Sequence, residues 1–153
     1  NWKDEDSVSN YLDKIMNKEA FNKTGLVYGM GHAIYTISDP RAVLLKEKAK
    51  KMAEEKGYED QFYLLDTIEK LTKIKMKERK GDDFEICANV DLYSGLVYEM
   101  LGINRQLYTP IFAVSRIAGW CAHRLEQIRD DKIMRPGYVS IRDLQNYTPM
   151  GKR

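Results

Sequence analysis

The stretch at residues 29–41 reads GMGHAIYTISDPR and joins a glycine-rich turn to the start of a helix. Asp39 is a typical capping carboxylate, and Pro40 fits the first helical position because its missing N–H would have no partner there anyway. Arg41 then lies in the first turn, where the partial positive charge of the helix end disfavours a base. The helix end and Arg41 together predict a seat for an anionic ligand, close to His32 at the tip of the turn.

The composition is that of a foldable chain and excludes several classes of protein. The 153 residues are 43% apolar and 31% charged, which is enough for one domain, or one compact domain with an extension. A formal net charge of +2 is too small to indicate a nucleic-acid partner. No apolar run approaches the roughly 18 residues needed to span a bilayer, and no signal peptide is present, so we expect a cytoplasmic protein with no membrane partner.

The two cysteines and the first residue add to this expectation. Cys87 and Cys121 form no metal-binding or disulfide pattern, so we expect no metal and predict that both are small buried apolar groups in a reducing compartment. The chain begins with Asn1 and enters a helical pattern almost at once, which suggests a piece of a longer protein.

Apolar residues repeat at helical spacing along most of the chain, which predicts an all-α fold. We expect five helices. The first follows the acidic residues 4–6, the second covers 40–56 and ends at Gly57, and the third covers about 59–80. The fourth begins near Val90 or Asp91 and ends at Gly102, and the fifth runs from Thr109-Pro110 to about 129. The last of these is apolar nearly all round through Trp120 and should be buried. Residues 132–153 have no helical period and predict an extended tail.

Two further arginines are candidates for binding an anion. Arg116 lies in the apolar helix and needs a partner there, which is either an internal acid or the carboxylate of a ligand. Arg135, before Pro136 in the tail, is either a solvated surface residue or an anion clamp. The lysines at 46–56 and 70–80 are interleaved with acids and read as solvated helix faces.

Asp91 and the two histidines are the candidates for proton chemistry. Asp91 stands at a helix start, where an acid is favoured by the helix dipole, or serves as a general base if it is partly desolvated. His32 is either satisfied within its loop or catalytic, whereas His123 lies in a helix and reads as ordinary.

Together these pieces resemble citrate synthase. The order and spacing of four motifs carry the resemblance: Gly31-His32-Ala33 with Asp39-Pro40-Arg41, Asn89-Val90-Asp91-Leu92-Tyr93-Ser94-Gly95, Phe112 to Ser115-Arg116, and Arg135-Pro136. The resemblance implies condensation of acetyl-CoA with oxaloacetate to citrate and CoA, a reaction of the tricarboxylic acid cycle, with acetyl-CoA as co-substrate and no tightly bound cofactor.

The resemblance also implies a role for each matching residue. His32 would donate a hydrogen bond to the oxaloacetate carbonyl, and Asp91 would take a methyl proton from acetyl-CoA. Arg41 and Arg116 would hold carboxylates of oxaloacetate and citrate, and Arg135 would reach the site of the other subunit of a homodimer. These roles agree with the preference of guanidinium groups for carboxylates.

Three more features follow from the resemblance. The backbone of Gly29, Met30 and Gly31 would cradle the adenine end of coenzyme A, and Phe112 would line the substrate pocket. Thr36 departs from family members that carry a basic residue facing the coenzyme phosphates.

The domain organisation implied is that of the C-terminal part of the enzyme. Residues 1–104 would be the small domain, and 105–153 the last helix and tail of the large domain. The family's upstream catalytic and substrate-binding histidines have no counterpart, because His123 is in the wrong place to replace them. We therefore expect an absent N-terminal large domain, an inactive isolated chain, and an exposed apolar helix that drives dimerisation or aggregation.

Alternatives from the same and other classes remain open. A 2-methylcitrate synthase would use propionyl-CoA, and one methyl group changes binding by only about 1–3 kcal/mol. A non-catalytic helical module that binds coenzyme A or a protein would leave the three arginines without a shared ligand. A nucleic-acid-binding helical domain using the lysine runs would show a steep salt dependence.

Overall fold

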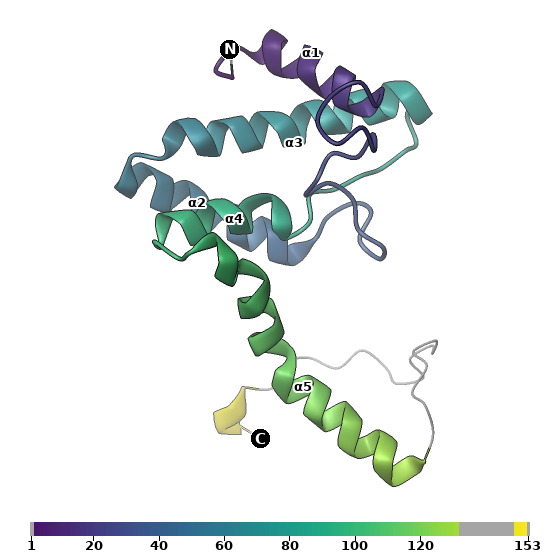
Figure 1. The fold of residues 1–153 in the computed structure, drawn as a ribbon, viewed down its shortest axis with the longest axis vertical. Helices are drawn as coiled ribbons and strands as arrows, with labels where there is room; N and C mark the ends of the chain where they lie inside the picture. The colour runs from purple at the N-terminus through teal and green to yellow at the C-terminus, as the bar shows by residue number, and fades with distance from the viewer. Residues whose placement is uncertain (1, 132–148, 153) are drawn as a thin grey trace. The chain divides into compact units, whose positions relative to one another are not determined.

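Helices joined by loops make up the chain (Figure 1). The computed structural model describes residues 2–131 and 149–152. Within these residues the α-helices are α1 (Glu5–Met16), α2 (Pro40–Lys56), α3 (Glu59–Lys80), α4 (Asp91–Met100) and α5 (Tyr108–Asp130), and the 3-10 helices are η1 (Arg105–Leu107) and η2 (Met150–Lys152). β-structure in the described part is one isolated antiparallel bridge between Met30 and Ala88, which confirms the all-α prediction.

The chain divides into two compact units, Asn1–Ile111 and Phe112–Arg153. The first unit contains α1 to α4, and the second contains most of α5. Of the extended tail predicted at 132–153, residues 132–148 and 153 lie outside the described residues, as does Arg135. Met150–Lys152 form the 3-10 helix η2, so the prediction of an extended segment was wrong for these three residues.

Local capping chemistry sets the bounds of the first helices. The Asp4 side chain accepts a hydrogen bond from the Ser7 N–H at 3.0 Å and begins α1. Asp39 accepts from the Arg41 N–H at 3.0 Å and begins α2, with Pro40 in its first turn. Gly57 ends α2 with a left-handed φ of +74°, a conformation that glycine adopts without a Cβ penalty. The predicted bounds of α2 and α3 are confirmed, and α1 begins at Glu5, within the acidic stretch that was expected to precede it.

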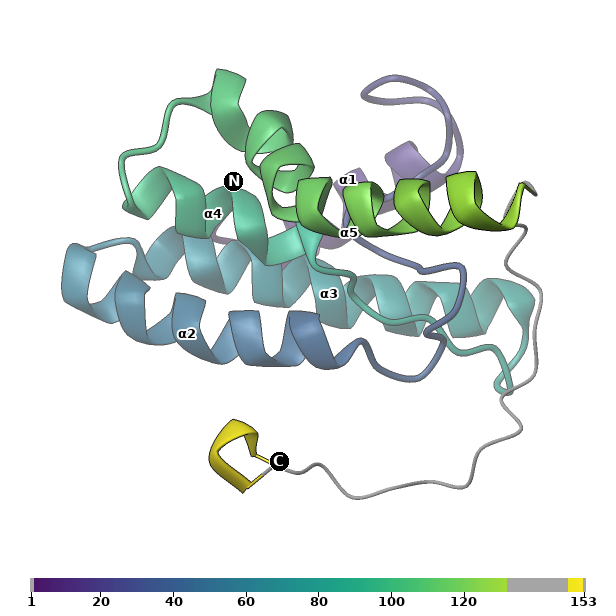
Figure 2. The same ribbon diagram turned by 90° about the horizontal axis from the view of Figure 1, so that it is seen from below.

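The core of the first unit lies where α2 and α4 pack on each other and on α3 (Figure 2). Its buried residues are Ala49, Ala53, Phe62, Ala88, Leu92, Tyr93, Leu96, Val97 and Met100. The alanines of α2 let α4 approach closely, and the large side chains come from α3 and α4. This packing fixes the start of α4 beside the loop that precedes α2.

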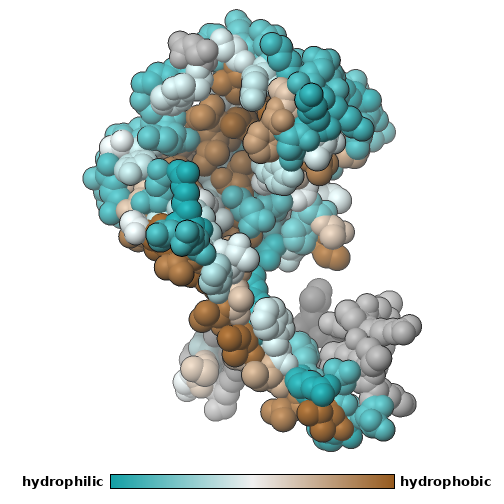
Figure 3. All heavy atoms as spheres, viewed as in Figure 1, coloured by the Kyte–Doolittle hydropathy of each residue, from teal (hydrophilic) through white to brown (hydrophobic). Residues whose placement is uncertain are grey.

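A second, smaller cluster holds α1 against α3 through Val8, Leu12 and Leu71. Apolar side chains gather in the hollow between these two helices (Figure 3). The hollow has a volume of about 430 Å³ and is lined by Trp2, Ser7, Val8, Tyr11, Leu12, Ile15, Leu64 and Ile68.

The start of α5 differs from the sequence prediction. The helix begins at Tyr108, because η1 runs directly into it and Asn104 caps η1 through a 2.9 Å hydrogen bond from the Gln106 N–H. Thr109 and Pro110 therefore lie inside the first turn, and the prediction that Thr109 caps a helix beginning at Pro110 was wrong by two residues.

The described residues of α5 are all exposed or half-buried. One stripe at spacings of three and four residues consists of Val114, Ile117, Cys121, Leu125 and Ile128. The prediction that Cys121 is buried was therefore wrong for this chain, since the stripe that carries it is uncovered. Cys87 is buried as predicted, and burial raises the pKa of its thiol. The burial predicted for α5 stays a prediction for a protein with a large domain.

The lysine-rich helix faces are less solvated than predicted. Lys75 is buried and pairs with Asp13 at 2.6 Å, which joins α3 to α1. Lys46 is half-buried and pairs with Asp66 at 2.5 Å and with Glu69 at 2.9 Å, which joins α2 to α3. These lysines act as cross-links between helices, so the prediction of fully solvated faces was wrong for them.

Candidate functional site

The glycine turn is held against the segment that precedes α4. The Gly31 N–H donates to the Cys87 carbonyl at 2.8 Å, and the Asn89 N–H donates to the Gly29 carbonyl at 2.9 Å. Gly29 has a φ of +83°, and a Cβ on it would lie 2.7 Å from the Leu92 Cα. Only glycine fits at this close approach, and the approach brings the turn directly onto the first turn of α4.

His32 follows this turn and has both ring nitrogens engaged. Its Nδ1 accepts hydrogen bonds from the backbone N–H groups of Ile34 at 3.0 Å and Tyr35 at 3.1 Å. A nitrogen that accepts two hydrogen bonds carries no proton, so the ring is neutral and its proton lies on Nε2. His32 is thereby prepared to donate one hydrogen bond from Nε2.

Arg41 lies beside the donating nitrogen of His32. Its Nη2 is 3.1 Å from His32 Nε2, and both atoms are donors in this tautomer. The two groups therefore do not satisfy each other. An oxygen with free lone pairs that lies in front of both nitrogens, at hydrogen-bond distance from each, would accept from both, so the pair forms a binding position for a carbonyl or carboxylate oxygen.

Asp39 orients Arg41 from the buried side. The carboxylate accepts from Arg41 Nε at 3.0 Å and from Nη2 at 2.7 Å, while it also caps α2. Asp39 is 1% exposed, and the Arg41 side chain is about half exposed. These hydrogen bonds hold the pKa of the Asp39 carboxyl below its usual range and raise the pKa of Arg41. Within the described residues, Nη1 of Arg41 has no partner and is open to a ligand.

Asp91 is the first residue of α4 and is exposed in this chain. Its backbone N–H donates to the Asn89 side-chain oxygen at 2.9 Å. The carboxylate charge of Asp91 adds, after Asp39 and Tyr35, to the raised pKa of Arg41, so the two charges interact across the site. His32, Arg41 and Asp91 thus belong to one region of the first unit.

The candidate residues Phe112 and Arg116 belong to the second unit. Arg116 is exposed, donates to the Ser115 hydroxyl at 2.5 Å, and lies over the Phe112 ring with 4.9 Å between the guanidinium carbon and the ring centroid. Among the described residues no acid pairs with Arg116, so the internal salt bridge weighed for it is not found there. The predicted role of Arg135 lies outside the described residues.

Sequence reasoning missed three residues that build this region. Asn89 connects the turn to α4, Asp39 orients Arg41 besides capping, and Tyr35 packs against both His32 and Arg41. The pairing of Asp39 with Arg41 was open to prediction, because both residues flank one helix start. The contacts of Asn89 join residues 58 positions apart and have no local signal.

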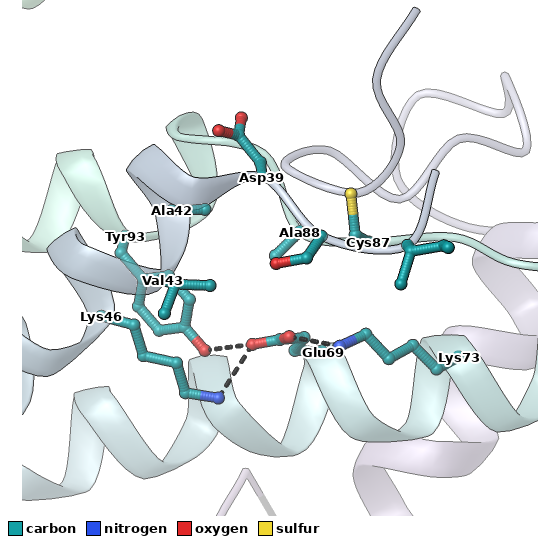
Figure 4. A pocket seen from close by; sticks show the side chains of 11 residues that line it. Asp39, Ala42, Val43, Lys46, Glu69, Lys73, Cys87, Ala88 and Tyr93 are labelled. Atoms are coloured by element: carbon teal, nitrogen blue, oxygen red, sulfur yellow. Dashed lines mark hydrogen bonds and ion pairs between the residues drawn. The ribbon is translucent and has the colours of Figure 1, made fainter. Parts of the chain in front are cut away.

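Behind Asp39 lies a small cavity of about 70 Å³, where a polar cluster connects α2, α3 and α4 (Figure 4). Glu69 of α3 accepts from the Tyr93 hydroxyl and Lys73, both at 2.6 Å, and from Lys46 at 2.9 Å. Burial alone would raise the pKa of Glu69, but these hydrogen bonds outweigh it and leave the pKa lowered. The Glu69 carboxylate is thus paired with three donors of the chain itself, and we interpret the cluster as a structural connection that holds α2, α3 and α4 together behind the site.

Residues 2–131 and 149–152 contain no group of three or more His, Cys, Asp or Glu side chains placed to hold a metal ion. Over the same residues, no helix is both long enough and apolar enough to cross a membrane.

The family model and the two curated relatives compared with this chain are all citrate synthases. The family model described as citrate synthase, C-terminal domain, matches residues 1–137. The citrate synthase of Acidithiobacillus ferridurans is 41% identical over 95% of this chain, and that of Synechocystis is 37% identical over 97%. The chain spans only 36% and 35% of the lengths of these two curated relatives.

Solved structures agree with the sequence relatives. One is the ternary complex of carboxymethyl coenzyme A and oxaloacetate with the citrate synthase of Thermoplasma acidophilum, which matches 97% of this chain and 40% of its own with a TM-score of 0.64 and 29% identity. The citrate synthase of Pyrobaculum aerophilum matches the whole chain and 39% of its own, with a TM-score of 0.61 and 34% identity. The match over residues 1–137, together with the shared all-α fold, shows that this chain belongs to the citrate synthase family.

Proposed function

We propose that this chain is the coenzyme-A side of a citrate synthase, which condenses acetyl-CoA with oxaloacetate to give citrate and CoA. Residues 1–104 are then the small domain, and 105–153 are the last helix and tail of a large domain whose N-terminal part is not in this chain. The observation that carries the proposal is the pair of donor nitrogens on His32 and Arg41, which lie 3.1 Å apart and can donate to one shared acceptor oxygen.

His32 polarises the electrophile in this proposal. Its Nε2–H donates to the ketone oxygen of oxaloacetate, and the two backbone donors on Nδ1 keep the proton on Nε2. Arg41 binds a carboxylate of the same molecule through Nη1 and Nη2, while Asp39 keeps the guanidinium plane in place. Negative charge that develops on the ketone oxygen is then stabilised by fixed donors.

Asp91 supplies the proton acceptor. Its carboxylate removes a methyl proton from acetyl-CoA, and the resulting enolate carbon attacks the polarised ketone carbon. The alkoxide left on the former ketone oxygen takes up a proton, which gives citryl-CoA. Water then cleaves the thioester and releases citrate and CoA. Asp91 is exposed in this chain, so its desolvation, which would raise its pKa toward that of a useful base, depends on the coenzyme and on closure against the large domain.

The remaining groups complete the binding of both substrates. The backbone of Gly29, Met30 and Gly31 receives the adenine end of coenzyme A, and Phe112 lines the substrate pocket beside Arg116. Arg116 binds a second carboxylate, which is supported by its exposed guanidinium and by the lack of an acidic partner in the described residues. Arg135 acts across a homodimer. No tightly bound cofactor is needed, and the enzyme is cytoplasmic.

A thiol-release assay with acetyl-CoA and oxaloacetate tests the proposal. We expect thiol release by the full-length protein that contains this chain, and none by residues 1–153 alone, since the upstream histidines of the family are not in it. Full-length protein that releases no thiol would overturn the proposal. The same assay with propionyl-CoA distinguishes a citrate synthase from a 2-methylcitrate synthase.

A further inference from the structure

Asn89 connects the two catalytic segments through both ends of one amide. Its Nδ2 donates to the Gly31 carbonyl at 2.8 Å, and its Oδ1 accepts from the Asp91 N–H at 2.9 Å. Gly31 directly precedes His32 in the chain. A single half-buried side chain therefore fixes the backbone on either side of the proposed site.

We propose that Asn89 is a positioning residue that sets the distance and direction between His32 and Asp91. This inference rests on the proposed function. Of the side chains of this length, asparagine carries a donor and an acceptor on one short planar group, and both are needed here. Aspartate would place two acceptor oxygens there, and one of them would repel the Gly31 carbonyl oxygen instead of donating to it.

The fold does not depend on these two side-chain hydrogen bonds. The backbone bonds from Gly31 to Cys87 and from Asn89 to Gly29 do not involve the Asn89 amide. The Met30–Ala88 bridge and the Gly29–Leu92 contact are also made by other atoms. Loss of the amide therefore leaves the segments paired but lets the His32 and Asp91 ends move relative to each other.

Such movement affects the chemical step more than substrate binding. The enolate carbon formed at Asp91 must meet the ketone carbon held at His32, and a misplacement of about 1 Å can lower the rate about 100-fold. Binding of each substrate uses other groups, namely Arg41 and the glycine turn. A positioning role thus predicts a fall in kcat with little change in either KM.

Asn89→Ser in the full-length protein should keep one of the two hydrogen bonds and remove the other. A serine hydroxyl can still accept from an N–H two residues further on, but it is too short to reach the Gly31 carbonyl. We expect kcat to fall about 10- to 100-fold, with both KM values within about twofold of the wild type. Asn104→Ser is the matched control, because Asn104 makes the same local cap in η1 away from the site.

A double substitution adds a readout that a purely structural role would not move. If Asn89 acts by holding the His32 segment in position relative to Asp91, Asn89→Ser should lower kcat less than about threefold in an Asp91→Asn background, where the carboxylate has already been removed. Equal losses in both backgrounds, or an unchanged kcat in the single variant, would overturn the positioning role while the proposed function stands. A wild-type protein without thiol release overturns the proposed function itself, and this inference with it.

Discussion

At the scale of single residues, Asp39 serves helix and site together. Its carboxylate caps α2 and also binds Arg41 at two nitrogens, although it is almost fully buried. The Arg41 hydrogen bonds that lower the pKa of Asp39 are lost when the carboxyl is protonated. The charged carboxylate therefore contributes stability at neutral pH; this contribution begins to decline below about pH 4, the pKa of an unfolded aspartate, and is lost as the pH falls through the lower pKa of the folded state.

Asp39→Asn tests this contribution, since asparagine caps a helix as well as aspartate does but carries no charge. We expect the substitution to lower the free energy of unfolding of the chain by about 1–2 kcal/mol at pH 7, given that Arg41 is half exposed. The difference should shrink at pH 3, because the Asp39 carboxyl of the unfolded chain is largely protonated there and the native carboxylate, with its lowered pKa, then contributes less stability. Urea unfolding at both pH values measures it, and Glu78→Gln on exposed α3 surface is the control.

Asp91→Asn tests the proton acceptor. In the full-length protein we expect kcat to fall by about 100- to 10,000-fold, the range for loss of a general base, with little change in the affinity for oxaloacetate. Glu99→Gln, an exposed acid on the same helix, should leave both parameters unchanged. Near-normal turnover of Asp91→Asn would remove Asp91 from this role.

The sequence indicated these residues but not their contacts. His32, Arg41 and Asp91 were identified as candidates because they stand at a turn and at helix starts, which are local features. The hydrogen bonds on His32 Nδ1 depend on how the loop folds back on the ring. Among the described residues Arg116 has no acidic partner and Cys121 is exposed; both features depend on tertiary packing, about which helical periodicity carries no information.

At the scale of elements, the contact between the glycine turn and α4 decides where Asp91 lies. Helices α1, α2 and α3 were predicted because capping residues and apolar spacing act within a few residues. The approach of Gly29 to Leu92 joins positions 63 residues apart and requires the packed core. Sequence could indicate a glycine turn, but not which helix it touches.

A comparison of Gly29→Ala with Gly31→Ala distinguishes the cost of steric overlap from the cost of backbone strain. Both glycines have a left-handed φ, but an added Cβ at Gly29 meets the Leu92 Cα at 2.7 Å, whereas at Gly31 the nearest atom is Ile86 Cδ1 at 3.7 Å. We expect about 1 kcal/mol of destabilisation at Gly31 and about 2–4 kcal/mol at Gly29. Urea midpoints of the two variants give the comparison, and equal losses would contradict a special contact at Gly29.

At the scale of the whole molecule, α5 presents an uncovered apolar stripe. Val114 and Leu125 are each 69% exposed, and Ile117 and Ile128 lie on the same stripe. Contiguous exposed apolar surface of this kind marks an interaction site or causes aggregation. In the proposed enzyme the large domain would cover it.

Self-association of the isolated chain follows from this surface. We expect light scattering of residues 1–153 to show dimers or larger species that grow with concentration. The double variant Ile117→Lys with Leu125→Lys should restore the monomer, whereas Ile74→Lys, at an exposed apolar position of α3, should not. A wild-type chain that stays monomeric at high concentration would contradict the expectation.

The turn that carries His32, the arginine beside it and the start of α4 all belong to the unit Asn1–Ile111, and contacts inside that unit hold them. This has a consequence for engineering. A chimera that grafts this unit onto the large domain of another citrate synthase would transplant the proposed proton acceptor Asp91 and the proposed hydrogen-bond donor His32 together, with their relative positions already set. Recognition of the second carboxylate, through the helix that bears Arg116, would be inherited from the host.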